Sequence, residues 1–178
     1  ILLKQSENYI LSNRIKKIKE FYNCKNSKDN IAEIFYIMAN FYSSERNYKL
    51  SNFYLKISLF LNKKFEPNKA LLAENLLFQK NFEQAENVYN SIKSIGDVYS
   101  WHSSKNIAII LKDRIGKEKS TSYLINNFYL LKNPDFQDYY EMANFYKENE
   151  YYKESIKYYS LALENINKNH NLISKILD

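Results

Sequence analysis

A literal internal repeat constrains this chain more than any other feature of its sequence. The five residues MANFY at 38–42 return unchanged at 142–146, 104 residues later. That separation is close to three times 35, so two further copies are expected in between. Both are present, because an alanine preceded by a large apolar residue recurs at steps of 34, 35 and 35. These alanines are Ala39, Ala73, Ala108 and Ala143.

Each alanine is followed by a small residue and then a large one at fixed distances. Twelve residues on, the small residues are Ser51, Ala85, Ser120 and Ser155, and four residues further the large ones are Leu55, Tyr89, Leu124 and Tyr159. Small side chains are needed where two helix axes approach closely, because larger ones would force them apart. The repeat therefore predicts four hairpins of amphipathic helices. Their paired ranges are 31–44 with 47–62, 67–79 with 82–94, 99–113 with 117–131, and 135–148 with 151–166.

Composition supports helices and excludes several classes of site. The chain has only two glycines and two prolines, whereas hairpin-rich β folds and phosphate-binding loops need many glycines. No apolar run approaches the roughly 20 residues that a bilayer requires, and no signal peptide opens the sequence, so membrane insertion is not expected. Cys24 is the single cysteine, which excludes an internal disulfide and a zinc site of several thiolates. The compartment stays open between cytoplasm and periplasm.

The two ends of the chain fit the repeat poorly. Within residues 1–30, spaced apolar residues predict one helix from Ser6 to Tyr22 that covers the first hairpin, followed by a polar loop at 23–30. Residues 170–178 predict the start of a fifth repeat or a capping helix. Because residue 1 is Ile and the last helical pattern stops abruptly, we expect the chain to be a segment of a larger protein.

The pattern resembles the tetratricopeptide repeat family. That unit of 34 residues carries small residues near positions 8, 20 and 27, and here four degenerate repeats cover about 32–65, 66–100, 101–135 and 136–169. The resemblance implies an all-α fold, a right-handed superhelical solenoid of antiparallel helical hairpins. It also implies that the first helix of each hairpin lines a concave groove in which a peptide or partner protein binds.

The family's groove positions map onto a mixed polar and aromatic set in this sequence. The predicted contacts are Tyr36, Asn40, Glu74, Phe78, Lys105, Lys112, Tyr140, Asn144 and Lys147. Asn40 and Asn144 are the leading candidates, since an amide can pair with the backbone of an extended peptide. The alternative is that each amide bonds only within its own helix. The clamp for chaperone C-terminal carboxylates is absent, because Tyr36 stands where that clamp needs a lysine.

No catalytic, metal or cofactor motif was found in the sequence. His102 and His170 are predicted to be ordinary polar residues at helix starts, without a partner for catalysis. Trp101 and Tyr99 allow two interpretations, an exposed aromatic platform or, as we expect for at least one of them, a plug between the second and third repeats. We therefore predict no enzyme activity, no cofactor and no metal site in this chain.

Three functions remain open from the sequence. The first is a protein-interaction scaffold, one segment of a larger bacterial tetratricopeptide protein. The second is the substrate-recruiting arm of a larger enzyme such as a glycosyltransferase. The third, an RNA-binding helical repeat, is disfavoured because the net charge of +6 comes from dispersed lysines, and the groove also carries Glu74. We expect a protein or peptide partner and no nucleic acid, and the sequence does not predict an oligomeric state.

Overall fold

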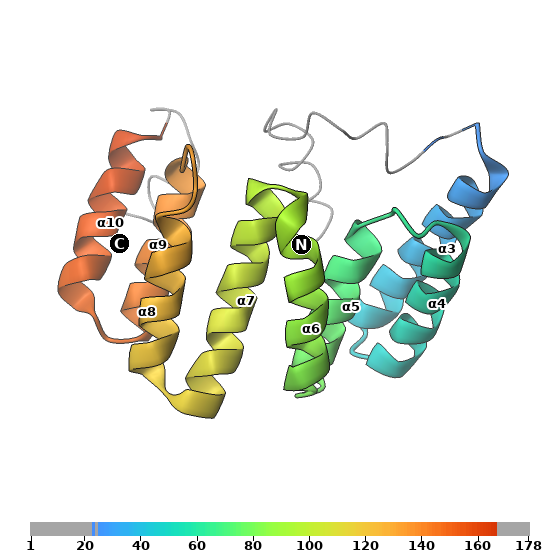
Figure 1. Ribbon diagram of the computed structural model, residues 1–178, viewed down its shortest axis with the longest axis horizontal. Helices are drawn as coiled ribbons and strands as arrows, with labels where there is room; N and C mark the ends of the chain where they lie inside the picture. Colours follow the sequence, from blue (N-terminus) through green and yellow to red (C-terminus); the bar gives the residue numbers. More distant parts are fainter. Residues whose placement is uncertain (1–22, 24, 167–178) are drawn as a thin grey trace. The chain divides into compact units, whose positions relative to one another are not determined.

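The computed structural model describes residues 23 and 25–166, and within them it is all-helical, without a strand (Figure 1). The helices are α3 (Ser27–Ser44), α4 (Tyr48–Leu61), α5 (Pro67–Phe78), α6 (Phe82–Ile92), the 3-10 helix η1 (Lys93–Ile95), α7 (Asp97–Ile115), α8 (Lys117–Phe128), α9 (Phe136–Glu148) and α10 (Tyr152–Glu164). The predicted all-α class is confirmed. No helix in this part of the chain is long and apolar enough to cross a membrane.

The chain divides into two compact units, residues 1–114 and 115–178, which are described separately. In the first unit α3 packs on α4, α5 packs on α6, and α4 and α3 both contact α5; in the second, α9 packs on α10. Every predicted helix boundary lies within four residues of the observed one. The N-terminal helix at 6–22, the segment 170–178, Cys24 and His170 lie outside the described residues.

The predicted loop at 23–30 is wrong in its second half, because α3 already begins at Ser27. Asn26 caps this helix: its side-chain oxygen accepts a hydrogen bond from the backbone N–H of Lys28 at 3.0 Å. Asp29 follows in the first turn, where a carboxylate interacts favourably with the positive end of the helix dipole. Polar residues that read as a loop are therefore the cap and first turn of a helix.

The four repeat alanines are completely buried, and the small residues twelve positions later are buried as well. In the first and last hairpins the small residue also makes a bond. The Ser51 hydroxyl donates to the Ala39 carbonyl at 2.8 Å, and the Ser155 hydroxyl donates to the Ala143 carbonyl at 3.0 Å. Serine at this position thus joins the two helices directly, in addition to letting them approach.

A left-handed turn without glycine closes three of the hairpins. Arg46, Lys80 and Glu150 have φ angles of 59°, 58° and 66°. The residue after each donates its backbone N–H to a carbonyl five positions earlier. These bonds are Asn47 to Tyr42 at 2.8 Å, Asn81 to Leu76 at 2.9 Å and Tyr151 to Tyr146 at 2.9 Å. This is the Schellman arrangement, which pairs carbonyls that would otherwise be left unpaired at the helix end.

A buried amide joins α5 to the first hairpin. The Asn75 side chain donates to the Ser51 hydroxyl at 2.7 Å and to the Asn52 side-chain oxygen at 2.8 Å, and its own oxygen accepts from the Ser43 hydroxyl at 2.7 Å. Asn75 is fully buried, so these bonds replace those that water would have made. About two turns earlier on α5, the Asn68 side chain similarly donates to the Ser58 hydroxyl at 2.8 Å.

Candidate functional site

Polar side chains from four helices meet around Glu74 in the first unit. We call them the Glu74 cluster, which consists of Tyr36 on α3, Glu74 on α5, Tyr89 on α6, and His102 and Lys105 on α7. The Glu74 carboxyl Oε1 lies 3.4 Å from the His102 Nε2, and both side chains are only about one-fifth exposed. Three of the predicted contacts, Tyr36, Glu74 and Lys105, are therefore brought together.

Burial decides the charge state of this pair. It raises the pKa of Glu74 from 4.5 to about 7, although the Lys105 ammonium works in the opposite direction. Burial, with a further contribution from Lys105, lowers the pKa of His102 from 6.5 to about 4. At neutral pH the imidazole is therefore uncharged, and the Glu74 carboxyl is protonated far more often than an exposed carboxyl would be. Despite the short distance, the two groups do not form an ordinary ion pair.

Two polar atoms of the cluster have no hydrogen-bond partner within the described structure. They are the hydroxyl of Tyr89, whose side chain is completely buried, and Nε2 of His102. The two rings meet edge to face with centroids 5.9 Å apart. Burial also raises the pKa of Tyr89, and the nearby Glu74 carboxylate adds to this effect. Apart from the Lys105 ammonium, the cluster therefore holds neutral donors and acceptors, and its charge depends on pH near 7.

The prediction for His102 is wrong. It was expected to be a polar residue at a helix start, but α7 begins five residues earlier at Asp97, and His102 is largely buried beside Tyr89 and Glu74. The repeat positions marked Glu74 as a groove residue but gave no sign of its burial, since an isolated acid in a helix is usually solvated. Only the packing of α7 beside α5 brings the two residues together.

The remaining predicted contacts of the first unit differ in exposure. The Asn40 amide donates to the Tyr36 carbonyl of its own helix at 2.8 Å, as the alternative interpretation of this residue proposed. Phe78 is 63% exposed, and its ring stacks on Tyr48 at a centroid distance of 5.6 Å. Lys112 is exposed on α7. Phe78 is thus an apolar surface group held in place by a neighbouring ring.

In the second unit, Tyr140 and Asn144 are joined through Tyr159 on α10. The Tyr159 hydroxyl donates to the Asn144 side-chain oxygen at 2.6 Å, and its ring lies 5.8 Å from that of Tyr140. Lys147 is exposed on α9. The Asn144 oxygen is therefore already used within the hairpin, which leaves its N–H₂ group and Lys147 as the more available contacts.

The tryptophan region is a packing feature. Trp101 and Tyr99 are only 4% and 6% exposed, so the expectation that at least one of them is buried is confirmed, and they form no exposed platform. The Lys105 ammonium lies 5.7 Å from the centre of the Trp101 ring, which helps to hold this lysine in the Glu74 cluster.

An apolar row on α3 was not anticipated from the sequence. Its side chains are spaced three or four residues apart and are 44–60% exposed: Ile31, Ile34, Ile37 and Phe41. They lie on a different face of α3 from Tyr36 and Asn40. The first helix therefore presents both polar and apolar groups at its surface.

Comparisons with known proteins assign no family to this chain. Within the described residues, no group of three His, Cys, Asp or Glu side chains is arranged to hold a metal ion. No family model matches the sequence, and no curated protein matches it. The arrangement of its own residues is therefore what indicates a function.

Proposed function

We propose that this chain is a tetratricopeptide-like solenoid that acts as a protein-interaction scaffold and binds a peptide or partner protein along its first helices. The observation that carries the proposal is the Glu74 cluster, to which the first helices α3, α5 and α7 each contribute a side chain. Side chains of consecutive first helices thus come together at one place, which supports binding along a row of repeats.

The chemistry of this surface supports a peptide ligand. Phe78 supplies an exposed aromatic ring, and its stacking on Tyr48 lowers the entropy lost when a partner immobilises it. The Glu74 cluster adds the partly exposed polar side chains of Tyr36, Glu74 and Lys105. Apolar contact area together with polar groups suits an amphipathic peptide.

Site-specific photo-crosslinking tests the proposal. A benzoylphenylalanine replaces Phe78 on α5 in one version of the native full-length protein and Phe60 on α4 in another, and each is irradiated in an extract of the source cells. Both positions are exposed phenylalanines, at 63% and 80%, so they are matched in chemistry and accessibility. The adducts are separated and identified by mass spectrometry.

We expect a discrete partner adduct from position 78 and none from position 60. Replacing Lys105 with alanine in the position-78 protein should reduce the adduct, because Lys105 contributes to the same surface. Adducts from position 60 alone, or from neither position, would refute a first-helix binding surface.

A further inference from the structure

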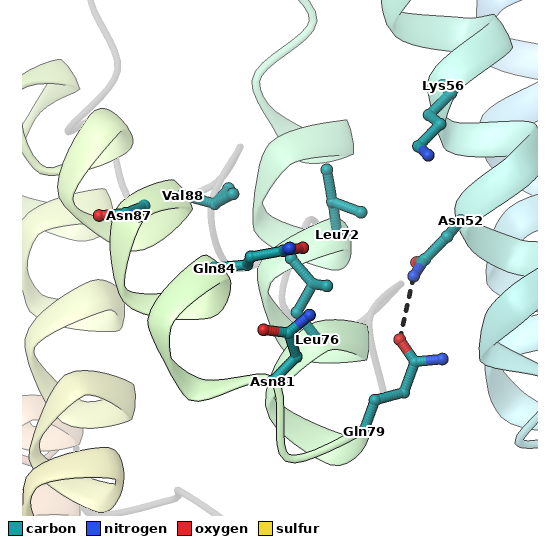
Figure 2. A pocket seen from close by; sticks show the side chains of 9 residues that line it. All are labelled: Asn52, Lys56, Leu72, Leu76, Gln79, Asn81, Gln84, Asn87 and Val88. Atoms are coloured by element: carbon teal, nitrogen blue, oxygen red, sulfur yellow. Dashed lines mark hydrogen bonds between the residues drawn. The ribbon is translucent and has the colours of Figure 1, made fainter.

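We propose that a second surface, the groove between α4, α5 and α6, binds an extended peptide segment that carries an acidic side chain. This inference rests on the proposed function, since it treats the chain as a protein-binding scaffold, but it names a different face and a defined chemistry. The groove has a volume of about 480 Å³, within the usual range for ligand sites. Figure 2 shows its lining: Asn52, Lys56, Leu72, Leu76, Gln79, Asn81, Gln84, Asn87 and Val88.

The groove combines amides with an aliphatic floor. Five of its nine lining residues are Asn or Gln, and three are Leu or Val. Asn52 and Lys56 come from α4 on one side and Gln84 and Val88 from α6 on the other, with Leu72 between them (Figure 2). Amides can donate to carbonyls and accept from N–H groups, so a row of them matches the backbone of a peptide that has no secondary structure of its own.

Three of the amides have no hydrogen bond in the described structure. Neither Gln84 nor Asn87 bonds through its side chain, and Asn81 precedes α6 without capping it. At the equivalent place before α4, Asn47 does cap its helix, by accepting from the Leu50 backbone N–H at 3.3 Å. The Asn81 amide is thus available to a ligand, although its position suits a structural role.

The opposite wall of the groove is preorganised. The Asn52 side-chain oxygen accepts from the buried Asn75 at 2.8 Å, and its N–H₂ group donates to Gln79 at 3.2 Å (Figure 2). An amide held from two sides loses little conformational entropy when a ligand binds beside it. The groove therefore offers one fixed wall and one wall of unpaired amides.

Charge and spacing define the peptide. Lys56 is the only charged residue in the lining, is exposed, and forms no ion pair in the described part of the chain. Asn52 and Lys56 are one helical turn apart, roughly 5.4 Å along the axis, and two residues of extended chain span roughly 6.6 Å. An extended segment can therefore meet Asn52 with one residue and Lys56 with an Asp or Glu two positions away. No aromatic ring lines the groove, so stacking on a sugar or a base is not provided.

The test uses short random linear peptides displayed on phage and selected on the 178-residue chain. Enriched peptides are synthesised, and their Kd values are measured by fluorescence anisotropy. We expect a shared acidic residue near an aliphatic one. Lys56→Glu should weaken binding at least about tenfold, as expected for loss of a charge-assisted hydrogen bond. A peptide with lysine in place of the acid should bind Lys56→Glu better than it binds the parent.

Matched controls separate the groove from general effects. Gln84→Ala and Asn87→Ala, which remove unpaired amides of the groove, should weaken binding. Their control is Asn90→Ala, which removes an amide of α6 outside the lining, and the control for Lys56→Glu is Lys49→Glu, which changes the net charge equally on α4 outside the groove. Both controls should leave Kd unchanged. Equal losses in the controls, no loss in Lys56→Glu, or selection of no peptide would overturn the inference. Peptides that lose affinity only for Phe78→Ala would overturn it too, while leaving the proposed first-helix function in place.

Discussion

The charge state of Glu74 and His102 makes a prediction about stability that two variants can resolve. A carboxyl whose pKa rises from 4.5 in the unfolded chain to about 7 in the folded one is bound to a proton more often in the folded state. Stability from this group is therefore fully present below pH 4.5 and is lost as pH rises to 7. The total change is roughly 3 kcal/mol, from about 1.4 kcal/mol for each tenfold change in proton affinity.

His102 produces the opposite slope. Its pKa falls from 6.5 in the unfolded chain to about 4 in the folded one, so between these values the unfolded state binds more protons. Stability from this group rises with pH across that window, again by roughly 3 kcal/mol. Between pH 4.5 and 6.5 the two slopes act together and nearly cancel. The pair should therefore contribute almost no pH dependence to the parent protein in this range.

Single substitutions should expose each slope. In Glu74→Gln the acid's penalty is absent, so the variant should gain roughly 3 kcal/mol relative to the parent between pH 4.5 and 7. His102→Gln should instead lose roughly 3 kcal/mol relative to the parent between pH 4 and 6.5. The quantity to compare is the difference in unfolding free energy between variant and parent at each pH, because contributions from all other titrating groups cancel in that difference.

Trp101 provides the assay. It is the only tryptophan, is buried in the first unit, and its fluorescence during urea unfolding reports on the unit that contains the pair. Unfolding curves at several pH values from 4 to 7.5 give the free energies. If the pair were a charged salt bridge, Glu74→Gln would show no relative gain between pH 4.5 and 7. If the free energies of unfolding of parent and variants changed with pH in parallel, the neutral pair would equally be refuted.

Three further predictions concern the packing of the hairpins. Ala143→Leu should overpack the crossing of α9 and α10 and lower the unfolding free energy by roughly 1 to 3 kcal/mol. Thermal unfolding followed by circular dichroism measures this change, and an unchanged melting temperature would contradict close packing at the crossing. Asn75→Ala should cost roughly 2 to 4 kcal/mol in urea unfolding, because the buried Ser51 and the partly buried Ser43 and Asn52 each lose a bond. Exposed Asn87→Ala should change stability by less than about 0.5 kcal/mol, and equal effects would show that the buried amide contributes nothing. Arg46→Gly and Lys80→Gly should leave stability unchanged or raise it by up to about 1 kcal/mol each. Glycine relieves the strain of the left-handed conformation but adds entropy to the unfolded chain. A clear loss of stability in thermal melts would contradict this reasoning.

The sequence predicted the hairpins well because their cause is local and repeated. Apolar residues follow the helical period, and a small residue recurs where the helices of a hairpin cross, so Ala39 and Ser51 mark the same contact as Ala143 and Ser155. The hydrogen bonds were not predictable from the same pattern. Asn40 and Asn144 occupy equivalent repeat positions, yet Asn40 bonds to its own helix and Asn144 accepts from a tyrosine hydroxyl. The difference arises because Tyr159 stands where the first hairpin has Leu55.

The Glu74 cluster could not be predicted for a different reason. Glu74 and His102 are 28 residues apart on separate helices, and their pKa values depend on burial that no local pattern records. The mapping of repeat positions did select Tyr36, Glu74 and Lys105, because positions one helical turn apart in the first helix of a repeat point to the same side. It identified which side chains share a surface, but it did not identify which of them are buried or how they are charged.

Helix α5 connects both proposed binding surfaces, because three consecutive residues point in three directions. A helix turns by about 100° per residue, so Glu74 lies in the polar cluster, Asn75 bonds into the first hairpin, and Leu76 lines the groove. Asn75 also holds Asn52, which forms the fixed wall of the groove. The position of α5 against the first hairpin therefore sets the geometry of the groove and the burial of Glu74 together. A ligand that shifted this helix from one side would alter the hydrogen bonds or the proton affinity on the other, whereas a rigid α5 would keep the two surfaces independent.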